Sequence, residues 1–436
     1  MDIDISELSR MCNGQWDNKD FVTVTGYSID SRTINPGDLF IPLVADRDGH
    51  EFISSAMEAG AAAHLFSHGE PFGPAIKVDD TSEALKRLGR EALKKLSATT
   101  LGITGSVGKT TTKDMARSCY ATLHKTWASD RSYNNEIGLP LTILGAPDDS
   151  KFLILEMGAR GIGHIRELCE ISRPQIGIIT RIGLAHSEYF GDIKKIIRAK
   201  GELVESLDSG GLAVLNHDDQ NVKNLKERTS ADVIFYGTEG GDVVGGNIVL
   251  DHELKPSFEI ESPWGNSHVR LNISGEHNVA NALAAASAAL YSNVPLEEVV
   301  NGLETVEVSP LRMETFLSSS GALVINDSYN ANPMSMKAAL ETLVSSGREN
   351  LFAVLGVMAE LGEESAARHK DIGEFAELCN VEVISIGVQE YEGAVVASID
   401  EAINLLKNQF FLDETAAVLI KGSRVVGLEG VADSLK

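Results

Sequence analysis

One short run of the sequence has the composition of a phosphate-binding loop. It reads Gly102-Ile103-Thr104-Gly105-Ser106-Val107-Gly108-Lys109-Thr110-Thr111 and follows a short β-rich stretch. Backbone N–H groups of such a loop, together with the N-terminus of the following helix, surround phosphate oxygens. We expect the amine of Lys109 to contact the β- and γ-phosphates of ATP and the hydroxyl of Thr110 to bind Mg²⁺. The loop departs from the general pattern at Ile103, where a glycine usually stands.

A carboxylate ends an apolar run further along the chain. Glu156 follows Phe152-Leu153-Ile154-Leu155, which predicts a buried strand. In an α/β sheet the carboxyl ends of the strands lie on the ligand side. An acidic residue there is often only solvated, but the phosphate loop implies a metal, and Mg²⁺ prefers carboxylate oxygen. We therefore expect Glu156 to bind Mg²⁺.

Two asparagine-rich runs follow, Ser274 to Asn281 and Asn326 to Pro333. An asparagine amide can donate to and accept from the edge of adenine, and an aspartate can accept from a ribose hydroxyl. Asparagine also caps helices, and we expect both Asn278 and Asn332 to begin one. Capping does not exclude ligand contact. His186 and Lys200 carry no chemistry by their types alone, since lone histidines and helix-surface lysines are usually structural.

The elements that position these residues alternate between strand and helix. Three segments are predicted, 1–98, 99–308 and 309–436, and all three are α/β. In the first, a helix spans Thr81 to Leu96, with Thr81 or Ser82 as its cap. In the second, a mostly parallel sheet is followed by a β region up to Ser274 and a helix from Asn278 to Ser292. The third resembles a smaller doubly wound domain.

Composition restricts the function classes. The 436 residues include 38 Lys and Arg against 63 Asp and Glu, a formal net charge of −25. This acidity argues against nucleic-acid binding. The four cysteines are far apart, so they predict neither a metal site nor a disulfide framework, and they are typical of a reducing compartment. No apolar run approaches the ~18 residues of a membrane span. We expect a cytoplasmic monomer.

Together, in order along nearly the whole chain, these residues resemble the Mur ligase family, most closely its MurF type. The resemblance adds further matching runs along the chain. They are Asp30-Ser31-Arg32-Thr33, Asp48-Gly49-His50, Asn134 to Pro140, Glu156 to Ala159, Leu355 to Gly362 and Lys421-Gly422-Ser423-Arg424. Asp327-Ser328-Tyr329-Asn330-Ala331-Asn332-Pro333 is the run most telling for the MurF type.

The resemblance implies three domains and a reaction. They are an N-terminal α/β domain for the UDP end, a central ATPase-like parallel-sheet domain with the phosphate loop, and a C-terminal Rossmann-like domain. The implied reaction joins D-Ala-D-Ala to UDP-MurNAc-tripeptide through an acyl phosphate, with ATP converted to ADP and phosphate. Two Mg²⁺ ions are implied, one held by Thr110 and Glu156. The other is held by His186 and by Lys200 as a carbamate formed with CO₂.

It also implies ligand contacts across the chain. The ATP site would comprise the loop Thr104 to Thr111, Asn278 at adenine, Asp327 at ribose and Arg312 at the phosphates. The UDP end would lie at Ser31 and Arg32. Candidates for the peptide and dipeptide are Asn135, Asn330, Lys421 and Arg424.

The sequence departs from the usual MurF pattern at Val357, at Arg160 and over Ala45–Arg47. None of these changes removes a residue assigned to ATP or metal. Two alternatives stay open: a sister ligase of the MurE or folylpolyglutamate type with another acceptor, and a non-catalytic nucleotide-binding module. Whether the tripeptide ends in lysine or diaminopimelate is also open.

Overall fold

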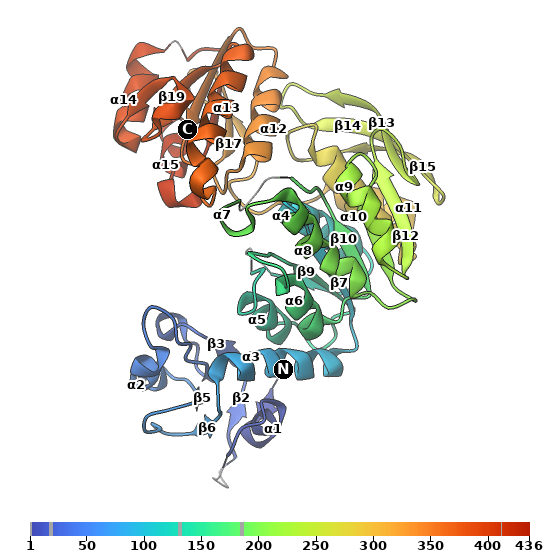
Figure 1. Cartoon of the computed structure of the whole chain (residues 1–436), viewed down its shortest axis with the longest axis vertical. Coiled ribbons are helices and arrows are strands. Elements are labelled where there is room, and N and C mark those ends of the chain that lie inside the picture. The colour runs from blue at the N-terminus through green and yellow to red at the C-terminus, as the bar shows by residue number, and fades with distance from the viewer. Residues whose placement is uncertain (1, 17–20, 130–132, 184–186, 411) are drawn as a thin grey trace. The chain divides into compact units, whose positions relative to one another are not determined.

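The computed structural model describes the whole chain except residues 1, 17–20, 130–132, 184–186 and 411 (Figure 1). The chain divides into two compact units. The first comprises Met1–Gly102, His124–Gly158 and His164–Ile176, and the second comprises Ile103–Leu123, Ala159–Gly163 and Gly177–Lys436. Within the described ranges, no helix is both long enough and apolar enough to cross a membrane.

The N-terminal part of the first unit is built on a small parallel sheet. Its four strands lie in chain order, β3 (Gly26–Ser28), β4 (Asp38–Phe40), β5 (Ala63–Phe66) and β6 (Ala75–Lys77). Helix α2 (Ile53–Glu58) packs on it through a core of Phe40, Ile53, Ala56 and Ala61. Helix α1 (Ile5–Met11) and the short pair β1 (Ile3–Asp4) and β2 (Thr23–Val24) complete this part.

Helix α3 (Thr81–Leu96) has the predicted bounds. Its apolar residues recur at helical spacing, so Ala84, Leu85, Leu88 and Ala92 are all buried on one side. The predicted cap at Thr81 or Ser82 was wrong, because the Asp80 carboxylate accepts the Glu83 N–H at 2.9 Å. Asp80 lies outside the apolar repeat, so the repeat by itself does not indicate this residue as the cap.

A nine-stranded sheet carries the phosphate loop. Its strand order is β15-β14-β13-β12-β11-β10-β7-β9-β8. Neighbours β8–β9, β11–β12 and β12–β13 are parallel, whereas β13, β14 and β15 form an antiparallel extension. The strands are β7 (Thr99–Thr104), β8 (Thr126–Ala128), β9 (Phe152–Glu156), β10 (Ile176–Ile179), β11 (Leu212–Asn216), β12 (Asp232–Gly237), β13 (Val243–Leu250), β14 (Pro256–Ser262) and β15 (Gly265–Arg270).

Helices lie between the strands up to β12 along the chain, and two more follow β15. They are α4 (Lys109–Ala121), α5 (Gly138–Leu144), α6 (His164–Ser172), α7 (Ser187–Phe190), α8 (Ile193–Glu205), α9 (Gln220–Lys223), α10 (Asn278–Tyr291) and α11 (Leu296–Glu304). The alanine-rich α10 packs against α4, the helix that follows the phosphate loop. Its interior is almost wholly buried, as its all-round apolar sequence predicts.

The C-terminal part of the second unit is a six-stranded sheet in the order β16-β17-β21-β18-β19-β20. The strands are β16 (Glu314–Leu317), β17 (Leu323–Asp327), β18 (Asn350–Leu355), β19 (Glu382–Ile386), β20 (Ala394–Val396) and β21 (Ala416–Lys421). Only the edge strand β16 pairs antiparallel. The helices are α12 (Pro333–Val344), α13 (Ser365–Leu378), α14 (Ile399–Gln409) and α15 (Glu429–Asp433). This is the doubly wound arrangement that the alternating pattern predicts.

Candidate nucleotide and metal site

The phosphate loop joins β7 to α4, and two of its glycines have backbone conformations that disfavour other residues. Gly105 has φ of +152°, and a Cβ there would lie 1.9 Å from the Thr180 hydroxyl. Gly108 has φ of +82° directly before α4, where a Cβ would lie 2.4 Å from Oδ1 of Asn281. The loop therefore needs glycine at both positions, both for its backbone conformation and because Thr180 and Asn281 lie so close to it.

The segment after β10 fixes the backbone of the loop. The Ser106 N–H donates to the Arg181 carbonyl at 2.7 Å, and its hydroxyl donates to the Gly183 carbonyl at 2.8 Å. The Thr180 hydroxyl donates to the Val107 carbonyl at 2.5 Å. These bonds tie the loop to the segment after β10 at Ser106 and at Val107, so the protein's own hydrogen bonds define the backbone of the loop at these two residues. Sequence reasoning missed Thr180, whose only signal is its place at the end of β10.

Two cations lie at this loop. Lys109 Nζ donates to the Gly105 carbonyl at 2.9 Å, so its ammonium lies back over the loop. Arg312 Nη2 donates to the Thr110 hydroxyl at 2.9 Å. The Arg312 guanidinium also lies over the Tyr329 ring, 4.2 Å from its centroid. The structure thus brings together three residues that the sequence assigned to ATP, and it adds Tyr329 as the support of one of them.

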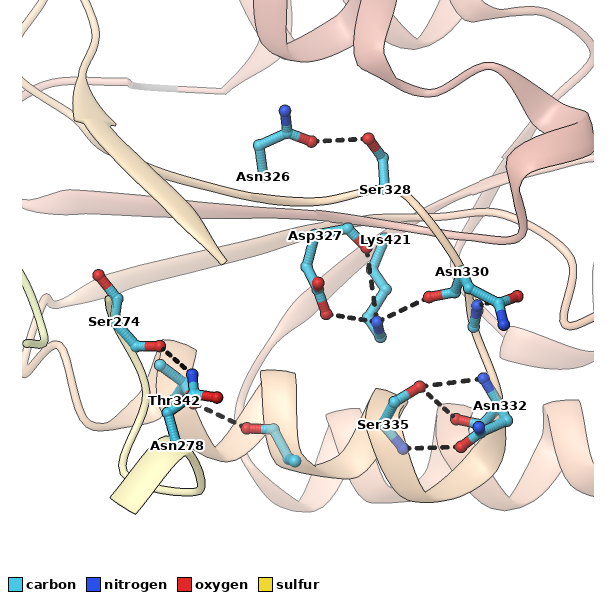
Figure 2. Close-up of polar contacts among 12 residues, drawn as sticks. Ser274, Asn278, Asn326, Asp327, Ser328, Asn330, Asn332, Ser335, Thr342 and Lys421 are labelled. Carbon is cyan, nitrogen blue, oxygen red and sulfur yellow. Dashed lines mark hydrogen bonds and ion pairs between the residues drawn. The ribbon is translucent and has the colours of Figure 1, made fainter. Parts of the chain in front are cut away.

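Asn278 lies at the first residue of α10 and is 1% exposed. One amide N–H donates to the Ser274 carbonyl at 2.8 Å, and Oδ1 accepts from Asn281 at 2.9 Å (Figure 2 draws the first contact). The prediction that Asn278 caps this helix was wrong. The N-cap is His277, and no side chain caps the helix, because the Asn278 amide instead bonds backward to the preceding turn.

Asp327 and Lys421 form an ion pair at the carboxyl ends of two adjacent strands, β17 and β21. The Lys421 ammonium also donates to the Asn330 carbonyl at 2.9 Å (Figure 2). The predicted cap at Asn332 is confirmed, since its side chain accepts from the Ser335 N–H at 3.0 Å in a reciprocal capping box. The Asp327–Pro333 run is therefore a loop held at both ends.

The charged residues of this loop affect the pKa of His277. Burial is the main reason that its pKa is lowered to about 4. The Asp327 carboxylate acts to raise the pKa, and the Lys421 and Arg181 cations act to lower it further. The imidazole is therefore neutral at physiological pH and adds no positive charge to the nucleotide site.

Glu156, in the first unit, is a buried carboxylate that ends β9 and is 2% exposed. The Asn134 amide donates to its Oε1 at 2.8 Å, and the Asn134 carbonyl accepts from the Gly158 N–H at 2.7 Å. A buried carboxylate held in this way has the donor chemistry of a Mg²⁺ ligand. The sequence alone indicates no role for Asn134, and its place in the Asn134-Asn135 pair is the signal that could have found it.

Lys200 is a buried lysine in the middle of α8, only 1% exposed. Next to it, Gly201 leaves room for Arg228, because a Cβ there would lie 2.2 Å from Arg228 Nη1. Arg228 donates to the carbonyls of Ile197 and Arg198, each at 3.2 Å, and so fastens the helix. The predicted metal ligand His186 lies outside the described residues.

The N-terminal candidates lie at the surface of the first unit. Arg32 is ion-paired with Asp30 at 2.6 Å, and this contact holds the pKa of the Asp30 carboxyl at about 2. Ser31 begins the short turn that Asp30 caps. This turn follows β3, so Ser31 and Arg32 lie beyond the carboxyl end of that strand.

A nearby cluster of Asp48, His50 and His68 has ligand atoms within 4.8 Å of one another. The His50 Nε2 atom accepts the Ser67 N–H at 3.1 Å, so the ring proton is on Nδ1, which faces the Asp48 carboxylate at 2.7 Å. A protonated nitrogen is not a metal donor. His68 Nε2 contacts the other carboxylate oxygen at 2.7 Å. The cluster fits a hydrogen-bonded support for Asp48 rather than a metal site.

The remaining dipeptide candidates differ in their surroundings. Asn135 is exposed, and its Oδ1 accepts from the Gly138 N–H at 2.8 Å at the start of α5. Arg424 is half exposed and contacts Glu429 at 2.9 Å. At the departure Val357, the structure uses the backbone carbonyl, which accepts from the Ser423 N–H at 2.9 Å. The departure therefore preserves the link between the Leu355–Gly362 and Lys421–Arg424 runs.

Comparisons with known proteins cover the chain from near its start to near its end. Family models match at residues 23–92 (Mur ligase family, catalytic domain), 103–289 (Mur ligase middle domain) and 311–424 (Mur ligase, glutamate ligase domain). The UDP-N-acetylmuramoyl-tripeptide–D-alanyl-D-alanine ligase of Mycobacterium bovis is 36% identical, with 94% of this chain and 92% of that protein covered.

Solved structures are similar over the same span. A crystal structure of MurF from Acinetobacter baumannii matches with a TM-score of 0.91 and 29% identity, covering 100% of this chain and 99% of that one. MurF ligase from Thermotoga maritima in complex with ADP matches with a TM-score of 0.85 and 27% identity, covering 94% and 97%.

Proposed function

Because this chain belongs to the Mur ligase family, we propose that it joins D-alanyl-D-alanine to UDP-N-acetylmuramoyl-tripeptide with ATP, making the pentapeptide precursor of peptidoglycan. One observation carries this conclusion: ligases of that activity match along almost the whole of both chains. The sister-ligase alternative would change only the acceptor. The non-catalytic alternative is disfavoured because the buried Glu156 and Lys200 and the cationic phosphate loop are all present.

ATP binds at the phosphate loop. Its backbone N–H groups and the N-terminus of α4 surround the phosphates, with Lys109 at the β- and γ-phosphates. Arg312 reaches the same loop by its bond to Thr110 and adds a second cation. Asn278 meets adenine with the N–H that does not contact Ser274, and Asp327 accepts from the ribose.

Metal binding is assigned by donor chemistry. Thr110 and Glu156 would hold one Mg²⁺, as the resemblance of their two sequence runs to the family implies. His186 and Lys200 would hold the second. The resemblance implies that the buried amine of Lys200 captures CO₂, and the carbamate that forms is an anionic oxygen ligand of the kind that Mg²⁺ prefers. When bound, Mg²⁺ neutralises the anionic phosphates and the attacking carboxylate.

The reaction follows from charge and leaving-group chemistry. A carboxylate oxygen of the tripeptide attacks the γ-phosphorus and ADP leaves, which gives an acyl phosphate. The amine of D-alanyl-D-alanine then attacks the acyl carbon, loses a proton and expels phosphate. Lys109 and Arg312 stabilise the negative charge on the phosphoryl oxygens. Water must be excluded meanwhile, because it would hydrolyse the acyl phosphate.

The substrate ends are assigned to the remaining residues. The UDP end lies at Ser31 and Arg32, and Asn135, Asn330 and Arg424 are assigned to the peptide and dipeptide. ATP and UDP-linked precursors are cytoplasmic metabolites, so we place the enzyme in the cytoplasm. We also propose that it acts as a monomer.

Incubation with ATP, Mg²⁺, tripeptide and D-alanyl-D-alanine tests the proposal. Phosphate release should require both substrates, and mass spectrometry should detect the pentapeptide with either the lysine or the diaminopimelate tripeptide. No pentapeptide with either tripeptide, from folded protein that still binds ADP, would reject the assigned acceptor and favour a sister ligase.

A further inference from the structure

Lys421 is a fully buried lysine at the carboxyl end of β21, the strand in the interior of the C-terminal sheet. It is 1% exposed, and its backbone pairs with Asp327 of β17 on one side and Leu355 of β18 on the other. Its own carbonyl accepts the Gly356 N–H at 2.9 Å. A charged side chain in such a place must have partners that repay the cost of burial.

The partners of the ammonium all lie in one loop (Figure 2). It contacts the Asp327 carboxylate, donates to the Asn330 carbonyl at 2.9 Å and lies 3.4 Å from the Asp327 carbonyl. A lysine ammonium has three N–H donors, and these contacts account for all of them. A dipeptide carboxylate could bind Lys421 only by displacing a contact that holds the loop.

The same loop carries groups that face the nucleotide site. Asp327 begins it, and Tyr329 in its middle lies under the Arg312 guanidinium, which contacts Thr110. The capping box at Asn332 fixes its far end. Lys421 is the side chain that fastens the stretch between those ends, because it contacts both Asp327 and Asn330.

We propose that Lys421 is a positioning residue of the nucleotide site, holding the Asp327–Asn330 loop so that Asp327 and Tyr329 meet ATP and Arg312, rather than a clamp for the dipeptide carboxylate. This inference rests on the proposed function in assigning Asp327 to the ribose of ATP. The charge of Lys421 also acts on the residue next to Asn278, which is assigned to adenine, because it lowers the pKa of His277.

The test compares nucleotide binding with dipeptide use in Lys421→Met, which keeps the length of the side chain and removes its charge. We expect the Kd for ADP, measured by calorimetry on the full chain, to rise about tenfold or more. The KM for D-alanyl-D-alanine should stay within about twofold, because the dipeptide does not contact Lys421. Lys436→Met is the matched control: its amine pairs with Asp433 at 2.7 Å on the surface, and both constants should be unchanged.

A double-mutant cycle with Asp327→Asn tests the route. If Lys421 acts through Asp327, Lys421→Met should add less than about twofold to the rise in ADP Kd already caused by Asp327→Asn. Independent effects that multiply would overturn the proposal. A raised dipeptide KM with unchanged ADP affinity would establish the clamp instead, and no change in either constant would also overturn it.

Two further measurements keep the result decisive. Circular dichroism and a thermal melt report whether Lys421→Met folds; if it does not, Lys421→Gln, which keeps an N–H donor without the charge, is judged by the same criteria. ADP binding does not require ligation. A wild-type chain that binds ADP but makes no pentapeptide would therefore reject the proposed function while leaving the Lys421 test intact.

Discussion

The Arg312 guanidinium donates a hydrogen bond to the Thr110 hydroxyl across 202 positions of sequence, with Nη2 and Oγ1 separated by 2.9 Å. One helical turn further along α4, the Asp114 carboxylate accepts the Ser309 N–H at 2.8 Å. The helix that follows the phosphate loop thus holds the chain at two points as it enters the C-terminal part. The phosphates of ATP bound at the loop would therefore contact Arg312, a cation that follows Ser309 in the sequence.

Loss of this cation should weaken catalysis. Arg312→Ala is expected to lower kcat/KM for ATP about 100-fold, because it removes charge-assisted bonds to the phosphates. Arg312→Lys should recover only part of the loss, since an ammonium lacks the planar face that lies over Tyr329. Steady-state kinetics at varied ATP measure both. An Arg312→Lys variant as active as the wild type would contradict a role for stacking of Arg312 on Tyr329. Tyr329→Phe, which retains the ring, is the matched comparison.

The lysine of the loop should matter more. Lys109→Ala is expected to abolish ligation, with a loss of about 1,000-fold or more in kcat, because the charge developing on the γ-phosphoryl oxygens loses the lysine cation assigned to stabilise it. Phosphate release with both substrates present is the readout. Lys125→Ala removes an exposed lysine that pairs only at the surface with Asp149 and should behave as wild type. Retention of more than about a tenth of the activity in Lys109→Ala would exclude the assigned role.

The buried lysine of α8 gives a separate prediction. Lys200→Ala should abolish ligation, and added bicarbonate should not restore it, because alanine cannot form a carbamate. In the wild type, ¹³C NMR with labelled CO₂ should show a carbamate signal that the variant lacks. Lys195→Ala, on the exposed side of the same helix, should keep both activity and signal. Substantial activity in Lys200→Ala would rule out the carbamate.

The lowered pKa of His277 predicts a pH dependence of stability. The unfolded imidazole titrates near pH 6.5 and the folded one at about 4. Between these values only the unfolded chain binds the proton, so stability falls as pH falls through this window and loses nothing further from His277 below it. From about pH 7 to about pH 5 the loss is about 2 kcal/mol. Urea unfolding at both pH values measures this loss. The free energy of unfolding should fall by about 2 kcal/mol more in the wild type than in His277→Gln between about pH 7 and about pH 5. Parallel curves for the two proteins would refute it.

The Asp114 contacts predict an effect on stability. Asp114 also pairs with the buried Lys113 at 3.1 Å. Asp114→Ala removes both contacts and should lower the free energy of unfolding by about 3 kcal/mol. Asp114→Asn keeps an acceptor for the Ser309 N–H and should lose less. Urea denaturation compares them, with the exposed Asp433→Ala as control. Equal stability of the alanine and asparagine variants would show that the Ser309 bond contributes nothing.

Local signals in the sequence predicted the elements whose formation depends mainly on their own residues. The apolar repeat predicted α3 to the residue, and the apolar run ending in Glu156 predicted β9 to the residue. The phosphate loop was found because its glycines and Gly-Lys-Thr are contiguous. The Asn332-Pro333 start of α12 was found for the same reason.

Contacts between distant segments were not predictable in this way. Nothing local to Arg312 indicates Thr110 or Tyr329 as its partners. The prediction that Asn278 caps a helix was wrong because its side-chain amide donates to the Ser274 carbonyl instead. Lys421 looked like a substrate ligand in the sequence, and only its burial against Asp327 indicates a different role. The metal roles of Glu156, Lys200 and His186 stay predictions.

Oxygen transfer from the tripeptide tests the central claim most directly, that ATP activates the carboxylate as an acyl phosphate. The terminal carboxylate is labelled with ¹⁸O, and the enzyme is supplied with ATP, Mg²⁺ and D-alanyl-D-alanine. We predict that one ¹⁸O atom appears in the released phosphate and the other stays in the new amide of the pentapeptide. Pentapeptide formation with no ¹⁸O in the phosphate would contradict the account.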